Sequence, residues 1–486
     1  MGRNRLLAIA AAIGVALAAG HTLAQQDSGG LYAPSVWDLT IGLHATELPT
    51  EQFMDFACGT NGGPPSTVIA DFADYATCRP EQGTGFHEVY FQYDDEYEYV
   101  ARARRDMTRA ALFQYTSVYS RPVIATALFD ADGFMRGLRL VTDPRVDLAT
   151  RGQAYTLGGF MRARYDGDWQ CEDLPRIEGE SAYQGMYIKE LCTLLDGNVR
   201  RTVETHLYRR PGQHEFDRNG LPTSGEFESV TRYEEIAIDE VEDREARLAA
   251  IAAAPPPEAD PLIAQALDCP GCDLARADLK RANLTGANLA GANLEGANLH
   301  AAILANANLA GANLRGANIN RSILTGANLA GADLSGAMLY ESRLDGANLA
   351  GATAVGLLAA HARLIRADLT GAIVADSDLT QIRMTNAVAV NASFARSGLQ
   401  QAQLMRTDFT GAILDRAVLL DSSLVGATLA GATARIADFL GADLRDTDLS
   451  NVNFSGSRMT GAILARAIVD GAVFEGTMLP AGFTPP

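Results

Sequence analysis

A five-residue repeat fills the second half of the sequence and limits its fold more than any other feature. From Leu274 the register steps by five to Leu479 without insertion or deletion, which makes 42 repeats. Leu, Ile, Val, Met or Phe holds the central position of every repeat except at four alanines: Ala354, Ala359, Ala389 and Ala434. A small residue, usually Ala, stands two positions before nearly every centre.

This period matches neither the 3.6-residue period of an α-helix nor the two-residue period of a plain strand. It fits a short extended piece followed by a turn. Because strand side chains alternate, the central residue and the small residue two before it share one face. We therefore expect both to point into a core, where the large one fills space and the small one allows a narrow corner.

The pattern A(N/D)LxG, over about residues 272–479, resembles the pentapeptide-repeat family. The resemblance implies a right-handed quadrilateral β-helix with four pentapeptides in each coil. Forty-two repeats would then form about ten and a half coils, or a solenoid about 50 Å long at about 4.8 Å per coil.

In such a solenoid, residues 20 apart lie in neighbouring coils. Ala389 and Ala434 would then stand beside the larger Phe409 and Phe454, which keeps the core at normal density. Ala354 and Ala359 have no such neighbours. We therefore expect the coil around residues 351–364 to be the most loosely packed.

Charge divides the chain at the start of the repeats. The 486 residues carry a net charge of −19, and residues 25–271 contribute nearly all of it, whereas residues 272–486 contribute about −2. The members of the resembling family best known for function mimic DNA and protect gyrase from quinolones. Because such mimicry needs a strongly acidic solenoid in the cytoplasm, we expect no nucleic-acid role and no nucleic-acid partner here.

Residues 27–250 predict an acidic α+β domain without a recognised family signature. Alternating apolar and polar residues predict strands over residues 87–103, 124–143 and 225–238, with a hairpin turn at Asp132-Gly133. Residues 48–58 and 66–78 resemble short helices, with Thr50 and Ser66 as N-caps. A proline-rich hinge and a short capping helix (residues 251–268), the repeats (269–480) and a tail (481–486) follow.

The start of the chain has the three regions of a secretory signal peptide. Arg3 and Arg5 precede an apolar run over residues 6–19, and Thr22-Leu23-Ala24 is a plausible cleavage signal. The run is shorter than the roughly 20 residues of a spanning helix, and no later segment is long and apolar enough. We expect a periplasmic or secreted protein with no transmembrane segment in the mature chain.

Six cysteines fall as three local couples: Cys58 with Cys78, Cys171 with Cys192, and Cys269 with Cys272. An even count in an exported protein favours disulfides, and local pairing is the simplest of the 15 connectivities that six cysteines allow. The Cys269-Pro-Gly-Cys272 segment also admits a redox site or part of a metal site. No second CxxC or paired histidines follow, so we favour a staple between the capping helix and the first coil.

No catalytic residue, cofactor site or metal site is identified. The acidic stretch at residues 93–99 and the Asp130 to Gly133 segment suggest a cation site or carboxylate catalysis. A strand with one solvated face and a tight turn explain them more simply. Both alternatives stay open.

Two groups of outward residues are candidate interaction surfaces. Arg343, Arg363 and Arg383 are 20 apart and should stack as a ladder. Glu341 and Asp345 would offset their repulsion, or the ladder would dock an anionic partner such as the acidic first domain. Near the end of the repeats, the successive outward residues are apolar, which predicts either a homodimer contact or cover by the C-terminal tail: Ile463, Ile468, Val473 and Met478.

The sequence thus predicts an exported, non-enzymatic scaffold or protein-interaction protein with an unknown protein partner. Two other classes remain open. One is an enzyme with an active site in residues 27–250, and the other is a cation-binding protein that uses the acidic domain.

Overall fold

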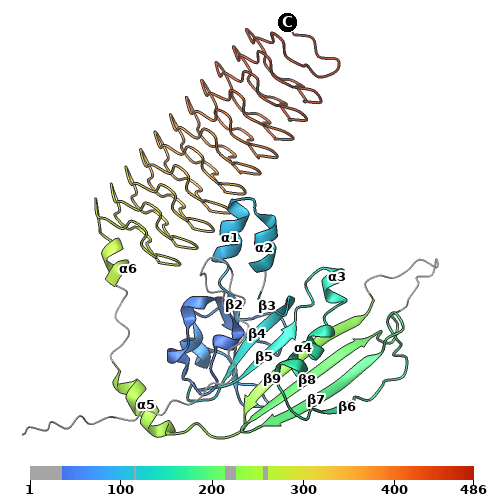
Figure 1. The fold of residues 1–486 in the computed structure, drawn as a ribbon. Coiled ribbons are helices and arrows are strands. Elements are labelled where there is room, and N and C mark those ends of the chain that lie inside the picture. Colours follow the sequence, from blue (N-terminus) through green and yellow to red (C-terminus); the bar gives the residue numbers. More distant parts are fainter. Residues whose placement is uncertain (1–34, 114–115, 214–225, 255–260, 486) are drawn as a thin grey trace, which may run out of the picture. The chain divides into compact units, whose positions relative to one another are not determined.

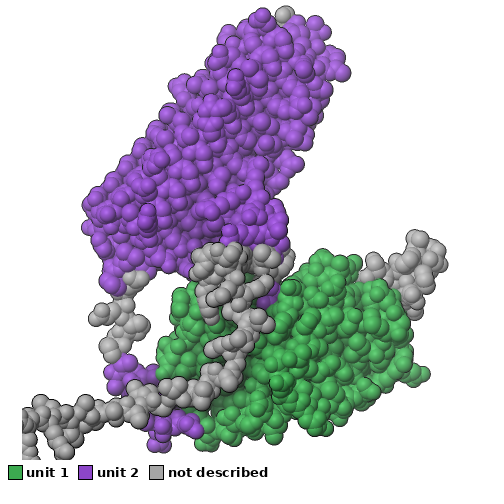
Figure 2. Space-filling view, viewed as in Figure 1, with its two compact units in different colours: residues 1–94, 118–241 green, residues 95–117, 242–486 purple. Residues whose placement is uncertain are grey.

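The computed structural model describes residues 35–113, 116–213, 226–254 and 261–485. Figure 1 shows the helices and strands of these residues, which form the two compact units coloured green and purple in Figure 2. The first unit consists of the residues up to 94 together with residues 118–241. The second consists of residues 95–117 and 242–486. The expected signal peptide, residues 1–24, lies outside the described residues. Within the described ranges, no helix has the length and apolar character needed to cross a membrane.

The first unit is built on one antiparallel sheet with the strand order β1-β2-β4-β5-β9-β8-β7-β6, and β3 pairs with β4. The strands are β1 (Phe53–Cys58), β2 (His87–Tyr93), β3 (Ser117–Val118), β4 (Arg121–Phe129), β5 (Met135–Thr142), β6 (Gln170–Asp173), β7 (Ile188–Asp196), β8 (Val199–Tyr208) and β9 (Glu228–Ala237).

Short helices and an aromatic core accompany this sheet. The helices are η1 (Val36–Asp38), η2 (Ala45–Glu47), η3 (Thr50–Gln52), η4 (Phe72–Thr77), α3 (Leu148–Arg151) and α4 (Thr156–Arg164). Phe72 is fully buried and packs edge-on against Phe53, Phe56 and Phe91. The α+β class and the hairpin turn at Asp132-Gly133, between β4 and β5, are as predicted.

Two predicted helices of this unit are largely wrong. Residues 53–58 form a strand because they pair with β2, and this tertiary pairing overrides the local helix pattern. Over residues 66–78 only the six-residue η4 is helical, and its N-cap is Asp71, whose carboxylate accepts the Ala73 N–H at 2.7 Å. Ser66 instead donates to the Cys58 carbonyl at 3.2 Å, and Thr50 lies inside η3.

The predicted strand over residues 87–103 is also partly wrong. Strand β2 ends at Tyr93, and α1 (Glu96–Ala103) follows, with α2 (Met107–Phe113) after it. The acids and tyrosines of residues 93–99 fit a strand alternation, but they equally fit a helix. Glu96 and Glu98 lie in the first turn, where carboxylates are favourable, and Glu98 pairs with Arg102 one turn later at 2.6 Å.

The repeats of the second unit form a β-helix-like solenoid. Parallel bridges join outward residues 20 apart, from Asp268–Asn288 through to Arg458–Met478, so one coil takes four pentapeptides. Up to Met459, the central N–H groups donate to carbonyls of outward residues in the next coil, as from Leu274 to the Asn293 carbonyl at 2.7 Å. The central residues and the small residues before them form one continuous buried core along the coils.

The fifth position of the repeat is Gly in many coils because the chain must turn there with a positive φ. Gly286 has φ +69°, and Arg281 has φ +58° at the same position one repeat earlier. Only Gly adopts this left-handed conformation without a steric penalty, which explains the preference in the sequence.

Helix α5 (Arg244–Ala253) precedes the hinge, of which residues 255–260 lie outside the described residues, and α6 (Pro261–Ala266) is the predicted short helix. The Cys269–Cys272 disulfide was expected to join this helix to the first coil, but both cysteines lie beyond the helix, within the solenoid. Cys269 does not end α6 but already holds a central position, five residues before Leu274, and its N–H donates to Asn288 of the next coil at 2.8 Å.

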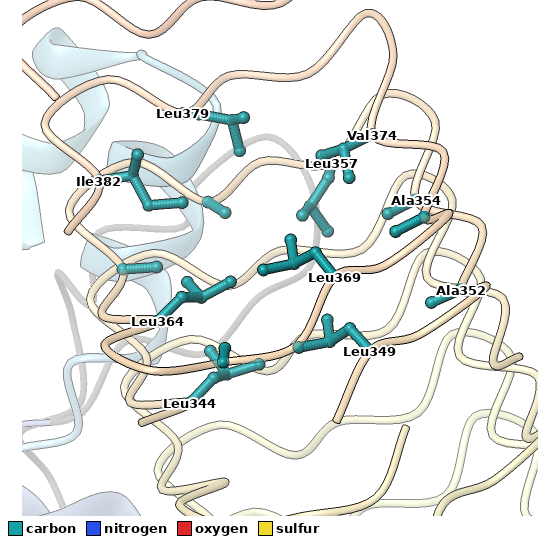
Figure 3. Close-up of a cluster of buried hydrophobic side chains, with 14 of the residues drawn as sticks. Leu344, Leu349, Ala352, Ala354, Leu357, Leu364, Leu369, Val374, Leu379 and Ile382 are labelled. Carbon is teal, nitrogen blue, oxygen red and sulfur yellow. The ribbon is translucent and has the colours of Figure 1, made fainter. Parts of the chain in front are cut away.

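A cavity interrupts the solenoid core where the sequence predicts loose packing (Figure 3). The centre of a water molecule could occupy about 20 Å³ of this cavity. Ala354 and Ala359 are among its apolar lining residues. Leu357 stands at a small-residue position and fills part of the space that Ala359 leaves. The cavity offers a water molecule no hydrogen bond, so we expect it to stay dry.

Candidate interaction surfaces

A helical hairpin, residues 95–113 with α1 and α2, lies against one side of the solenoid (Figure 1). The hairpin belongs in sequence to the loop between β2 and β3, yet it is part of the second unit. We call the solenoid side that it contacts the hairpin side. Its stacked outward residues are Asn298, Asn318, Met338, Leu358 and Asp378.

Apolar contacts form the middle of this docking. Ala103 of α1 is buried in a small cluster with Met338, Tyr340 and Ala360 of the solenoid. Tyr99, Val100 and Leu358 pack against the same cluster. Met338 and Leu358 replace the Asn or Asp usual at outward positions; with the hairpin in place Met338 is buried and Leu358 is partly buried.

Asp95 forms a charged contact at the start of α1. Its carboxylate lies 2.8 Å from Nε2 of His300 and also pairs with the Arg321 guanidinium. His300 is fully buried, and its Nδ1 has no hydrogen-bond partner among the described residues. Removing the Asp95 carboxylate would therefore leave a second buried nitrogen of the same ring unsatisfied.

A second charged contact lies at the far end of α1. Arg105 donates from Nε to Asp378 Oδ2 at 2.5 Å and from Nη2 to Thr380 Oγ1 at 2.7 Å. Burial acts to raise the pKa of Asp378, but the hydrogen bonds from Arg105 and Thr380 outweigh it and hold this pKa below its usual value. The carboxylate is therefore ionised at neutral pH.

Tyr99 lies between the two charged contacts. Its hydroxyl donates to Glu341 Oε2 at 3.0 Å, and its ring packs against Tyr340 with the centroids 5.8 Å apart. Burial raises the pKa of Tyr99, so it keeps its proton and remains a donor at neutral pH. Glu341, expected from the sequence to offset the arginines, is thus engaged by the hairpin.

The predicted arginine ladder is present as a stack. Parallel bridges link Arg343 to Arg363 and Arg363 to Arg383. Asp345 pairs with Arg363 at 2.9 Å, as one of the two acids expected to do so. Arg343 and Arg383 are exposed.

The four outward apolar residues near the end of the repeats are exposed. Their exposed fractions are 48% for Ile463, 51% for Ile468, 43% for Val473 and 65% for Met478. The core residues of the same coil are only partly buried, among them Leu464 and Phe474, and Phe483 covers part of Phe474. Apolar surface is therefore open at this end of the described solenoid.

The six cysteines pair as the sequence favours, in three disulfides: Cys58–Cys78, Cys171–Cys192 and Cys269–Cys272. The first anchors the glycine-rich loop after β1, and the second joins directly opposed residues of β6 and β7. The third joins the first central position of the solenoid to the next small-residue position, and so closes the first corner.

Carboxylates gather around Arg139 on one face of the first unit's sheet. Arg139 is 2% exposed and lies 2.7 Å from Glu81, 2.8 Å from Glu88 and 2.6 Å from Glu234. Burial acts to raise the pKa of Glu81, but the hydrogen bond and charge of Arg139 lower it overall. Arg139 therefore ties the 79–86 loop, through Glu81, to the strands that carry Glu88 and Glu234, which is a structural role.

The other acidic segment is a turn, as the simpler interpretation held. Asp130 Oδ1 accepts the backbone N–H groups of Asp132 and Phe134, each at 3.1 Å. This geometry closes the β4–β5 hairpin. The solvated-strand interpretation of residues 93–99 is wrong, because those residues end β2 and begin the docked hairpin.

Comparison with known proteins identifies the repeats. A sequence model described as pentapeptide repeats matches in eight copies over residues 268–300, 292–329, 302–339, 321–353, 362–401, 402–435 and 437–476. The matched segments leave out residues 354–361, which include Ala354 and Ala359 of the cavity lining. No curated protein matches the sequence.

Solved structures are also similar to part of this chain, among them the following three. HetL, a pentapeptide repeat protein involved in heterocyst differentiation regulation from the cyanobacterium Nostoc sp. strain PCC 7120, is 28% identical over 45% of this chain and 89% of its own, with a TM-score of 0.25. QnrB1, a plasmid-mediated fluoroquinolone resistance protein, is 19% identical over 33% and 84%, with a TM-score of 0.28. A pentapeptide repeat protein of the Arabidopsis thaliana thylakoid lumen is 30% identical over 22% and 63%, with a TM-score of 0.09. The match to the sequence model identifies pentapeptide repeats within residues 268–476 of this chain.

Proposed function

We propose that this chain is an exported, non-enzymatic scaffold whose solenoid binds other protein segments along its sides. The docked hairpin is the observation that carries the proposal. Met338 and Leu358 are outward residues that would face solvent in a bare solenoid, and here they are covered by α1. A side of this solenoid thus holds a helix through an apolar centre and charged ends.

Export to the periplasm or the outside of the cell is part of the proposal. The signal-peptide pattern of residues 1–24 supports it. Three disulfides with no free cysteine among the described residues also fit an oxidising compartment. A right-handed, four-sided coil would give the scaffold four flat sides, and the small net charge of the repeats favours protein over nucleic-acid partners.

We also propose a homodimer through the C-terminal coils. The exposed Ile463, Ile468, Val473 and Met478 support it, because exposed apolar patches mark contact sites. Light scattering of the purified chain should give the mass of a dimer, and I468K/M478K should give that of a monomer. A monomeric wild-type chain at high concentration would exclude this contact.

Affinity capture of the mature protein from its native compartment tests the scaffold. Wild type should recover a protein in fixed stoichiometry. Two variants show which side of the solenoid binds the captured protein. I373K/I413K places lysines on one side, and R343S/R363S/R383S removes the arginines from another. The proposal predicts loss of the captured protein in at least one solenoid variant. Recovery that is unchanged in every solenoid variant would place binding outside the solenoid and contradict it.

A further inference from the structure

Five arginines gather on one part of the solenoid. Arg343, Arg363 and Arg383 occupy the same outward position in three successive coils. Arg366 and Arg406 lie at the adjoining turn, each three residues after an outward position on that side, and both have a positive φ. We call these five residues the arginine face.

The arginine face departs from the way other arginines of the solenoid are neutralised. In four places an arginine pairs with the aspartate 20 residues earlier, in the preceding coil: Arg396–Asp376, Arg435–Asp415, Arg458–Asp438 and Arg466–Asp446. The residues 20 before the arginine face are Ile323, Arg343, Gly346, Arg363 and Asn386, so none of them is acidic.

The charge on this face is therefore largely uncompensated. Among the described residues only Arg363 of the five has an ion pair, with Asp345. Glu341 accepts the Tyr99 hydroxyl and is held toward the hairpin. Guanidinium groups in coils about 4.8 Å apart repel one another, so a bound row of negative charges would stabilise the face.

The spacing of the ladder favours a helix as the source of those charges. Residues i and i+7 of an α-helix are about 10.5 Å apart along its axis, with i+4 between them. The first and third of three coils are about 9.6 Å apart, so the two spacings differ by about 1 Å. In an extended strand, side chains on one face recur about every 6.7 Å and lose register with the ladder after one coil.

The adjoining side of the solenoid already holds a helix whose carboxylates contact basic side chains of the coils. The start of α1 places Asp95 against His300 and Arg321, and Glu96 lies 3.4 Å from Lys280. The arginine face also has apolar neighbours at its turn, the half-buried Ile365 and the exposed Met405. An amphipathic helix with one acidic stripe matches both the charges and these apolar groups.

We propose that the arginine face binds an α-helix of a partner protein that carries carboxylates at i, i+4 and i+7. The inference rests on the proposed scaffold function and names the chemistry of one partner. Its apolar residues would lie on Ile365 and Met405, and its carboxylates would meet Arg343, Arg363 and Arg383.

The test uses the full chain and a fluorescent synthetic amphipathic helix with glutamates at i, i+4 and i+7, followed by anisotropy. R343S/R363S/R383S should weaken binding by at least about tenfold, and about 0.5 M salt should do the same to wild type. The control R396S/R435S/R458S removes as many arginines, all of which pair with aspartates, and should bind as wild type does. R383E alone gives the same test at one exposed residue, in case the triple variant unfolds.

Three results would overturn the inference: equal binding by the triple variant and wild type, equal binding of a peptide with the same residues in scrambled order, or displacement of the peptide by polygalacturonate at lower concentration. The last would identify an acidic polysaccharide as the ligand. Capture of a partner without peptide binding would remove only this inference, whereas absence of any captured partner would remove the scaffold function itself.

Discussion

Arg105 of the helical hairpin and Asp378 of the solenoid are 273 residues apart in the chain and form a hydrogen-bonded ion pair. Asp378 is on the same stacked side as Met338 and Leu358, which α1 covers. The pair therefore fixes one end of a helix whose middle is held by apolar contacts.

This ion pair makes the docking of the hairpin sensitive to acid. The pKa of Asp378 is lowered in the folded protein, so its contribution is complete above the unfolded value of about 3.9 and is lost as the pH falls through the folded value. The protection of α1 against hydrogen exchange, relative to the intrinsic exchange rate at each pH, should therefore fall below about pH 4. Because Arg105 is mostly exposed, the effect should stay below about 1 kcal/mol.

D378N is the matched variant for this prediction. It should remove the acid sensitivity of α1 and leave exchange in β4 and β5 unchanged. An acid response of α1 that is equal in wild type and D378N would assign the effect to other carboxylates.

Filling the cavity should stabilise the solenoid. Val in place of Ala354 adds two methyl groups to empty space and should raise the free energy of unfolding by about 1 kcal/mol. Ala389 is fully buried one coil before Phe409. Val at this position should overpack the core and lower the free energy of unfolding by about 1–3 kcal/mol.

Urea unfolding followed by circular dichroism measures both variants. Both tryptophans, Trp37 and Trp169, are in the first unit, so their fluorescence reports that unit separately and should not change. Equal destabilisation by A354V and A389V would show that the space beside Ala354 is not available to a side chain.

The disulfides should differ in their contribution to stability. The chain-entropy relation gives about 3 kcal/mol for the loop closed by Cys58–Cys78, with a separation of 20, and about 2 kcal/mol for Cys269–Cys272, with a separation of 3. C58A/C78A should destabilise the unit read by tryptophan fluorescence. C269A/C272A should act on the solenoid alone and increase hydrogen exchange in its first coil. A larger effect of C269A/C272A would mean that the first coil holds more of the solenoid together than its contacts indicate.

The solenoid was predictable because its repeat period and the residue types at each repeat position fit only one local structure. The period of five, the large residue at Leu274 and every fifth position after it, and the small residue two before define a repeated corner around a core. The same register located the cavity at Ala354 and Ala359, since a core position without a large side chain or a large neighbour leaves space.

The helical hairpin was not predictable in the same way. Residues 93–99 alternate acids and tyrosines, and this fits a strand as well as the start of an amphipathic helix. Its partners, among them His300 and Arg321, are more than 200 residues away, and only the fold brings them to Asp95. One signal was present: Met338 and Leu358 are apolar at successive positions of one side, where Asn or Asp is usual.

The central claim is that a side of the solenoid binds a helix, and hydrogen exchange of residues 96–103 in the full chain tests it most directly. M338S/L358S removes the apolar centre of the contact, and I463S/I468S removes apolar groups elsewhere on the same solenoid. The account predicts that α1 is protected in wild type and in I463S/I468S and loses that protection in M338S/L358S. Protection of α1 that is absent from wild type, or that persists in M338S/L358S, would contradict it.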